Sequence, residues 1–229
     1  MARALAAEGA SVALVSRDRD LLHRVSADIR AAGGRAEPFA ADVASEEQVR
    51  RVEQEVLERF GTVNILINNA GVVMRSPIGE ISLEDWRRVM DTNVTSAFLM
   101  CRSLIPHMRG QGYGRILNLT SIMSWVSMPD RAVYSSSKAA LLGLTRGLAL
   151  ELAPECITVN GISPGPFATE LTRPILDNPE VNAQFLSNIP LKRWGKPEEV
   201  GQLAVYLCSD AAGFITGTDI VIDGGWTAR

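Results

Sequence analysis

A tyrosine, a lysine and a serine near the middle of the chain have the types and spacing needed for proton transfer. Tyr134 and Lys138 are four residues apart, and Ser121 ends the apolar run that precedes them. In a helix the tyrosine and the lysine project from one face, where the ammonium group lies beside the phenol. A neighbouring cation lowers the pKa of a phenol from about 10, and a serine hydroxyl can bind a reacting oxygen. These residues predict acid–base chemistry at an oxygen atom.

The spacing Tyr-x-x-x-Lys also arises by chance, so the surrounding segments decide its meaning. Asn-Asn-Ala-Gly at residues 68–71 follows a continuous apolar run, and its small residues let the backbone approach a flat ligand. Asn93 interrupts a helical pattern that it does not favour, which indicates a packing or polar role. Each feature has an ordinary alternative, namely a simple turn for residues 68–71 and a solvent-facing side chain for Asn93.

Taken together, these motifs resemble the short-chain dehydrogenase/reductase family along essentially the whole chain, from Met1 to Arg229. The segments that follow Gly165 and Trp194, and the tail from Asp223, are most similar to gluconate 5-dehydrogenase-like members, with 3-oxoacyl carrier-protein reductase-like members close behind. The resemblance implies an NAD(P)-dependent oxidoreductase that interconverts an alcohol and a carbonyl, on a sugar acid or a related small polar substrate. It implies a catalytic tetrad of Asn93, Ser121, Tyr134 and Lys138.

The same resemblance implies where a dinucleotide cofactor binds. It assigns an adenine contact after the second apolar run, a cofactor wall after the third, and a turn that holds the nicotinamide end. It also assigns the lysine of the tetrad to the nicotinamide ribose and, through water, to a proton relay with the asparagine. The implied cofactor residues are Ser16, Arg17, Asp42, Val43, Asn69, Ala70, Gly71, Tyr134, Lys138, Pro164, Gly165 and Thr169.

Two of these cofactor residues have competing interpretations. At Arg17, members that favour NAD usually present an aspartate to the ribose, whereas an arginine offers a bidentate partner for the 2′-phosphate of NADP. An exposed loop arginine is the ordinary alternative, so we expect NADP and keep NAD open. Asp42 is equally consistent with an aspartate that holds a turn before a helix.

The elements that must position these residues alternate along the chain. Apolar runs predict strands, and 3.6-residue periodicity with capping residues predicts helices between them. Such alternation predicts one doubly wound parallel sheet of α/β, Rossmann-like type over residues 1–229, with its ligand outside the carboxyl ends of the strands. The expected strands cover residues 12–16, 36–40, 63–67, 116–119, 157–161 and 219–222, and the main helices 18–32, 45–61, 82–110, 134–152 and 197–208.

The segment at residues 167–193 differs from the rest. Prolines at 174, 179 and 190 break it into short pieces of mixed polarity. Segments of this kind that follow a strand in an α/β protein more often cover a ligand than contribute to the core. We therefore expect a substrate lid.

The front of the chain departs from the family pattern. Residues 2–8 predict the end of a helix closed by Gly9, so the leading strand and the glycine-rich turn of the family are absent from the sequence. Because that turn holds the pyrophosphate, an alternative function is a fragment that keeps the catalytic residues but binds cofactor too weakly to act.

Composition limits the partners. The 229 residues carry a net charge of −3 with no basic tract, which argues against nucleic acid and anionic membranes. The apolar runs are too short to cross a bilayer and the N-terminus does not resemble a signal peptide, so we expect a cytoplasmic protein. Residues 134–152 are apolar on several faces, which predicts a homo-oligomer, and the family resemblance implies a tetramer.

No residue pattern predicts a metal site. Cys101, Cys156 and Cys208 are far apart, and His23 and His107 are isolated in polar helical contexts. We therefore expect catalysis without a metal ion.

Overall fold

The computed structural model describes residues 1–228, apart from the side chain of Leu171, and its strands all pair in parallel. The predicted doubly wound parallel architecture is confirmed, with one difference in its continuity. Instead of one hydrogen-bonded sheet the described residues form two, in the orders β1-β2 and β3-β4-β5-β6. The strands are β1 (Ser11–Ser16), β2 (Arg35–Ala40), β3 (Ile65–Asn68), β4 (Gly114–Leu119), β5 (Ile157–Pro164) and β6 (Asp219–Ile222).

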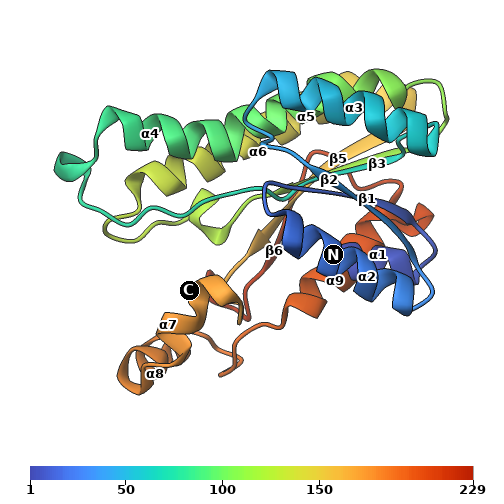
Figure 1. Ribbon diagram of the computed structural model, residues 1–229. Coiled ribbons are helices and arrows are strands. Elements are labelled where there is room, and N and C mark those ends of the chain that lie inside the picture. Colours follow the sequence, from blue (N-terminus) through green and yellow to red (C-terminus); the bar gives the residue numbers. More distant parts are fainter. Residues whose placement is uncertain (229) are drawn as a thin grey trace.

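Helices cover both faces of the strand layer (Figure 1). One layer contains α3 (Glu46–Phe60), α4 (Leu83–Met90), α5 (Ser96–Leu104) and α6 (Ala132–Leu152). The opposite layer contains α1 (Ala2–Ala7), α2 (Arg19–Ala31) and α9 (Pro197–Cys208). Two short helices, α7 (Arg173–Leu176) and α8 (Pro179–Ser187), lie outside both layers. They belong to the segment predicted to be a lid.

The helix starts follow from local sequence. The side chains of Asp18, Ser45 and Ser82 each accept a hydrogen bond from a backbone N–H in the first turn of α2, α3 and α4. Such caps satisfy donors that a helix terminus otherwise leaves unpaired, and each is typically worth about 1 kcal/mol. Gly61 ends α3 at φ 76°, a left-handed conformation that favours glycine.

The prediction of a single helix at residues 82–110 is wrong in the middle and at the end of this range. A π-helical turn, Asp91–Thr95, separates α4 from α5, and α5 ends at Leu104. A 3₁₀ turn that contains Pro106 follows, because proline lacks the N–H that a continued helix needs. π turns inside helices are frequent at functional sites, and this one contains Asn93.

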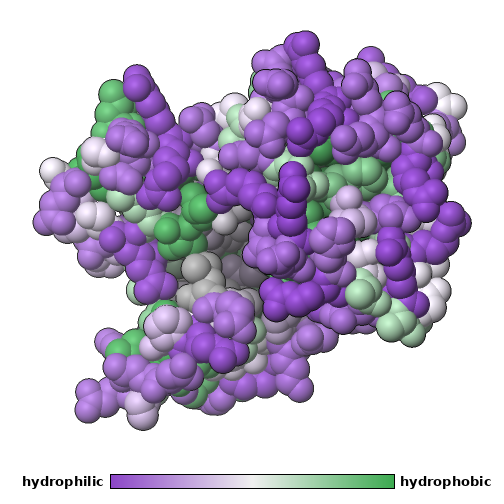
Figure 2. Space-filling view, in the orientation of Figure 1, coloured by the Kyte–Doolittle hydropathy of each residue, from purple (hydrophilic) through white to green (hydrophobic). Residues whose placement is uncertain are grey.

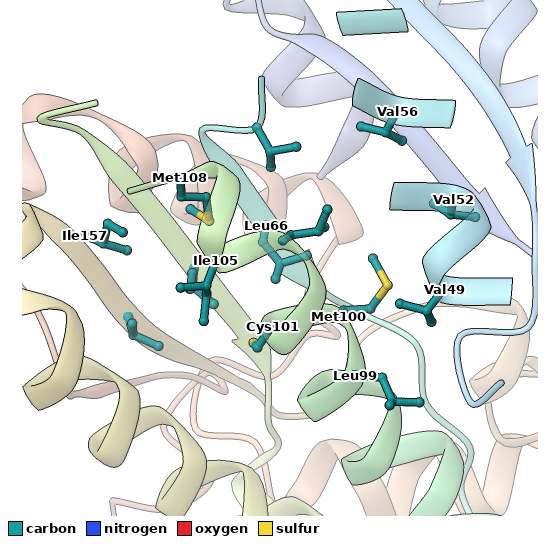
Figure 3. Close-up of a cluster of buried hydrophobic side chains, with 14 of the residues drawn as sticks. Val49, Val52, Val56, Leu66, Leu99, Met100, Cys101, Ile105, Met108 and Ile157 are labelled. Atoms are coloured by element: carbon teal, nitrogen blue, oxygen red, sulfur yellow. The ribbon is translucent and has the colours of Figure 1, made fainter. Parts of the chain in front are cut away.

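One hydrophobic cluster joins the two sheets even though their hydrogen bonds do not. Phe39 of β2 and Leu66, Ile116 and Ile157 of β3 to β5 belong to the same buried set, which packs under α3 and α5. Figure 3 shows valines of α3 facing Leu66 and the side chains of α5 across this cluster. Burying a side chain of this size contributes about 1.5 to 3 kcal/mol, so apolar packing holds the two sheets together.

A row of polar side chains links two neighbouring strands of the four-stranded sheet to a helix. Asn68 Nδ2 donates to Asn118 Oδ1 at 2.8 Å, and Asn118 Nδ2 donates to Thr145 Oγ1 at 2.9 Å. The row links β3, β4 and α6, and Asn118 and Thr145 are buried. Fully satisfied buried polar groups favour one arrangement of the elements that carry them, which here fixes the strand ends against α6.

Candidate active site

The end of β4 and the first turns of α6 bring three of the predicted residues together. Ser121 follows β4, and its Oγ accepts a hydrogen bond from Met123 N at 3.1 Å. Its hydroxyl also forms a hydrogen bond with Tyr134, in the first turn of α6. Lys138 is one turn further on, with Nζ 5.8 Å from the centre of the Tyr134 ring. The predicted shared helix face is confirmed.

Lys138 is a buried cation that ties α6 to the end of β4. Its side chain is only 4% exposed, and Nζ donates a hydrogen bond to Leu119 O at 2.6 Å. Burial lowers the pKa of Lys138 from 10.5 to about 8. The ammonium group is therefore still charged at neutral pH, but it exchanges its proton more readily than an exposed lysine does.

The pKa of Tyr134 differs from the expectation. Burial raises this pKa above its ordinary value, although the Ser121 hydrogen bond and the charge of Arg131 act in the opposite direction. Lys138 was expected to lower it, but its ammonium group is near the face of the ring and binds the Leu119 carbonyl. The Tyr134 hydroxyl is consequently protonated at neutral pH, which suits a proton donor.

Asn93 faces inward, as its predicted polar role requires. It is 1% exposed, and its amide binds both backbone groups of Val72, accepting from N at 2.7 Å and donating to O at 3.0 Å. The amide also donates to Ser137 Oγ at 2.9 Å. These contacts fix the π turn to the segment after β3 and to α6, while the predicted water-linked relay to Lys138 stays a prediction.

Ser137 is a site residue that sequence reasoning missed. It is completely buried, and its Oγ donates to the Tyr134 carbonyl at 2.7 Å while it accepts from Asn93. It therefore links two members of the predicted tetrad. A small hydroxyl residue directly before Lys138 was the available signal.

Asn69, Ala70 and Gly71 follow β3 and are exposed. A Cβ at Gly71 would be 3.4 Å from both Asn93 Oδ1 and Lys138 Nζ. The segment therefore passes directly beside the tetrad, and a larger side chain at residue 71 would press on Asn93 and Lys138.

The predicted adenosine-side residues lie at the ends of β1 and β2. Ala41 N donates to the carbonyl of Ser16 at 2.9 Å, which keeps the two strand ends together. Arg17 is exposed, with Nη1 3.7 Å from Asp42 Oδ2. Asp42 Oδ1 accepts from Ala44 N at 2.9 Å, so the predicted turn role of Asp42 is confirmed, and Val43 packs against the core.

The predicted nicotinamide-side residues lie at the end of β5. Gly165 follows Pro164, donates to Ile222 O at 2.9 Å and passes so close to β6 that a Cβ would be 2.6 Å from Asp223 Cβ. Thr169 is exposed and begins a 3₁₀ turn, with its backbone N bound to Thr172 Oγ1 at 2.9 Å. Close packing thus requires glycine at 165.

The predicted lid is anchored at its far end by aromatic rings. Phe185 of α8 stacks on Trp194 with ring centres 5.6 Å apart and contacts Trp226 of the C-terminal segment at 5.7 Å. A cavity of about 80 Å³ lies at its base, lined in part by Phe167 and Leu191. Figure 2 shows the surface hollowed between the α7–α8 segment and the part of the molecule with α4 and α6.

Two arginines lie at the entrance to α6. Asp130 has φ 62°, an unusual conformation for a residue with a side chain, and its carbonyl accepts from Ser76 N at 3.1 Å. This bond places Arg75 near Arg131, which precedes the first residue of α6. Arg131 Nη1 is buried and has no hydrogen-bond partner among the described residues. Burial and the charge of Arg75 both lower the pKa of Arg131.

Residues 1–228 contain no group of three or more metal-binding side chains arranged around one point. Nor does this part of the chain include a helix with the length and apolar character needed to cross a membrane.

Comparisons with known proteins give one consistent result. The family model described as enoyl-(acyl carrier protein) reductase matches residues 1–227. Cyclopentanol dehydrogenase of Comamonas testosteroni is 38% identical over 98% of this chain and 90% of the relative. A 3-oxoacyl-[acyl-carrier-protein] reductase of Synechocystis is also 38% identical, over 98% of this chain and 90% of the relative. The crystal structure of a gluconate 5-dehydrogenase from Burkholderia cenocepacia in complex with NADP and tartrate is 33% identical, with a TM-score of 0.94 over 100% of this chain and 89% of that chain.

Proposed function

Because the chain belongs to the short-chain dehydrogenase/reductase family, we propose that it interconverts an alcohol and a carbonyl with NADP as cofactor. The observation that carries this proposal is the arrangement of buried Ser121 and Lys138 around the half-buried Tyr134 at the carboxyl end of β4. Ligands of doubly wound folds bind at that edge of the sheet.

In the reducing direction Tyr134 donates its hydroxyl proton to the carbonyl oxygen of the substrate. Ser121 donates a hydrogen bond to the same oxygen and keeps it within reach of the phenol. General acid catalysis of this kind typically contributes about 10² to 10⁴-fold to the rate. Lys138 orders the start of α6 through Leu119 and has further N–H groups for a ribose hydroxyl. NADPH, when bound, supplies the hydride.

The residues around the tetrad fit a dinucleotide. The backbone at Gly71 passes beside Asn93 and Lys138, so a flat ligand against it would lie near both side chains, and Gly165 holds the end of β5 against the residue after β6. Arg17 at the end of β1 presents an exposed guanidinium group for a 2′-phosphate. NADP in the gluconate 5-dehydrogenase relative supports the same preference, with NAD as the alternative.

The substrate class that we favour is a sugar acid or another small hydroxy acid. Nη1 of Arg131 is buried with no hydrogen-bond partner in the part of the chain that the structure describes, and the like charge of Arg75 is close to it. An unpaired buried donor is unfavourable by about 1 to 3 kcal/mol, and an anion would relieve it. Arg131 also acts electrostatically on Tyr134, so a carboxylate bound there would lie near the reacting group.

The relatives suggest two competing substrates, a neutral cyclic alcohol and a 3-oxoacyl carrier-protein thioester. Steady-state turnover of gluconate, cyclopentanol and a 3-oxoacyl thioester with NADP or NADPH tests the proposal. We expect the acid to have the highest kcat/KM and Arg131→Ala to lower that value at least tenfold more than it lowers the value for cyclopentanol, which shares only the effect of Arg131 on Tyr134. Arg109→Ala, which removes a cation paired with Glu155, is the control. Equal losses for acid and neutral substrates would contradict the assignment of Arg131.

A second candidate function is a protein that keeps the tetrad but binds cofactor too weakly to act. The interrupted hydrogen bonding between the two sheets favours this alternative, because the expected dinucleotide site draws residues from both of them. Calorimetric titration with NADP distinguishes the two. Binding in the micromolar range supports the enzyme, and the absence of heat at millimolar NADP supports the alternative.

We also propose that the chain forms a homo-oligomer through α6. Leu150 on this helix is 82% exposed, and a Cβ at Gly143 or Gly147 would meet nothing within 4 Å. Phe98 of α5 is an exposed aromatic ring in the same helical layer. A flat apolar surface of small residues suits close packing against a second copy. Light scattering at micromolar concentration should give a mass above that of one chain, and Leu150→Glu should lower it.

A further inference from the structure

The carboxylate of Asp219, at the start of β6, accepts hydrogen bonds from a residue before Ser121 and from a residue after it. Asp219 Oδ1 accepts a hydrogen bond from Thr120 Oγ1 at 2.6 Å, and Oδ2 accepts from Trp125 Nε1 at 2.6 Å. Thr120 immediately precedes Ser121, and Trp125 ends the turn that Ser121 caps. Two distant segments of the sequence therefore meet around the serine of the tetrad.

The carboxylate reaches Thr120 by crossing over β5. Gly161 of β5 is paired with Asn118 of β4 on one side and with Asp219 of β6 on the other. A Cβ at Gly161 would be 2.1 Å from Asp219 Oδ1, far closer than atoms approach without bonding. The crossing therefore depends on a glycine at this position.

The hydroxyl of Thr120 is available for the carboxylate. Its Oγ1 is also 2.7 Å from Ile162 O and 3.2 Å from Ser163 Oγ, but both of these acceptors are neutral. A hydroxyl has one proton to donate, and a hydrogen bond to a charged acceptor is the stronger choice. Asp219 thus fixes the threonine side chain, and the backbone bond from Thr120 N to Ile162 O at 2.9 Å fixes the start of the turn.

The second contact restrains an exposed segment. Trp125 is 51% exposed, and residues 126–130 after it are exposed as well. The guanidinium group of Arg146 on α6 lies 5.7 Å from the centre of the Trp125 ring, so the ring is held by a carboxylate at its N–H and a cation over its face. Loss of Asp219 would therefore remove the hydrogen bond that restrains the indole N–H.

We propose that Asp219 is a positioning residue, which fixes the Ser121 hydroxyl relative to Tyr134 by binding the residues on either side of its turn. Displacement of a catalytic group by about 1 Å lowers turnover by about 100-fold. This role rests on the proposed function for its effect on turnover, while its effect on Trp125 is independent of activity.

The principal test compares Asp219→Ala with Asp219→Asn on the full chain. Alanine removes both acceptors, so kcat should fall about 10 to 100-fold. Asparagine keeps a carbonyl oxygen for Trp125 and an amide near Thr120. The fall in log kcat in Asp219→Asn should therefore be at most half of the fall in Asp219→Ala. The Kd for NADP should stay within twofold, because the carboxylate binds the serine turn rather than the predicted cofactor residues. Asp210→Ala, an exposed carboxylate near Arg115 at the opposite end of β4, is the control and should match the unsubstituted chain.

A spectroscopic measurement follows the same contact without substrate. Quenching of tryptophan fluorescence by acrylamide should increase in Asp219→Ala, and this increase should disappear when Trp125→Phe is added. Trp125→Phe removes the Nε1–H but keeps an aromatic ring on the surface, so it tests the contact even if Asp219→Ala folds poorly. Trp125→Phe should lower kcat about threefold to tenfold. The double variant should have a kcat close to that of Asp219→Ala alone, because the effects of residues in one hydrogen-bond network are not additive.

Three results would overturn the role of Asp219. One is kcat within twofold of the unsubstituted chain in Asp219→Ala, and another is unchanged acrylamide quenching in that variant. The third is a parallel loss of kcat, NADP affinity and thermal stability without recovery in Asp219→Asn, which would show a general structural role. A lack of turnover by the unsubstituted chain on all three substrates would instead count against the proposed function, and the quenching result would still decide the Trp125 contact.

Discussion

The two sheets end in sites of different construction. At the end of the four-stranded sheet Asn93, Ser121 and Lys138 are each at most 5% exposed and hydrogen-bonded to other elements. At the end of the two-stranded sheet Arg17 is exposed, and its ion pair with Asp42 has a separation of 3.7 Å. The first region has one arrangement fixed by burial, whereas the second presents charges to solvent.

The difference follows from what each region is proposed to do. Proton transfer needs groups held at fixed distances, which buried and fully satisfied polar networks provide. Discrimination between NADP and NAD needs only a favourable charge at the surface, and exposed ion pairs contribute about 0 to 1 kcal/mol to folding. Substitutions should therefore alter turnover at the first region and selectivity at the second.

The sharpest test of this contrast is Tyr134→Phe. The substitution keeps the ring and its packing but removes the exchangeable proton, so kcat should fall about 10² to 10⁴-fold with little change in thermal stability. Steady-state kinetics and a melting curve measure the two effects. Tyr206→Phe, at an exposed ring on α9, is the control. Near-normal turnover by Tyr134→Phe would remove Tyr134 from the chemistry.

At the two-stranded sheet, Arg17→Asp should reverse the cofactor preference. It replaces an attractive partner of the 2′-phosphate by a repulsive one, and a charged hydrogen bond of about 1.5 to 3 kcal/mol corresponds to at least tenfold in the NADP to NAD ratio of kcat/KM. Turnover at saturating NAD should be unaffected. Arg19→Asp makes the same charge change two residues away and should leave the ratio unaltered. If both variants shift the ratio equally, Arg17 has no specific role.

Ser137→Ala examines how far the first region depends on its internal bonds. The change removes one link from Asn93 and one from the Tyr134 carbonyl and leaves a buried amide donor unsatisfied, so unfolding should become easier by about 1 to 3 kcal/mol. For a chain of this size that is a fall of about 2 to 4 °C in Tm per kcal/mol. Scanning calorimetry measures it. Ser136→Ala changes an exposed neighbour on the same helix and should have no effect.

The smallest expected effect is the pH dependence that Lys138 contributes. The pKa of Lys138 is about 8 in the folded chain, compared with an ordinary value of 10.5. At a pH between these two pKa values, the lysine therefore binds a proton more fully in the unfolded chain than in the folded chain. Stability therefore rises with pH in this window, by about 1 kcal/mol from pH 7 to pH 9. Urea unfolding of the unsubstituted chain and of Lys138→Met at both pH values isolates this contribution. An equal slope in both proteins would show that Lys138 titrates normally.

Local sequence determined much of the architecture. The caps at Asp18, Ser45 and Ser82, and the shared face of Tyr134 and Lys138, depend on residues within four positions of one another. Short-range hydrogen bonds and helical periodicity are therefore visible before any tertiary contact is known. For the same reason the doubly wound, parallel class of the fold was reached from alternating apolar and periodic segments.

The π turn at Asn93, the raised pKa of Tyr134 and the bond from Trp125 to Asp219 were decided only by the tertiary structure. Asp219 and Trp125 are 94 residues apart, and they meet because β5 places a glycine between β4 and β6. The pKa of Tyr134 depends on burial by elements from the whole chain, which outweighs its nearest charges. Sequence spacing identifies which groups can do the chemistry, whereas desolvation and contacts across the sheet set their protonation and position, because both depend on every element packed around them.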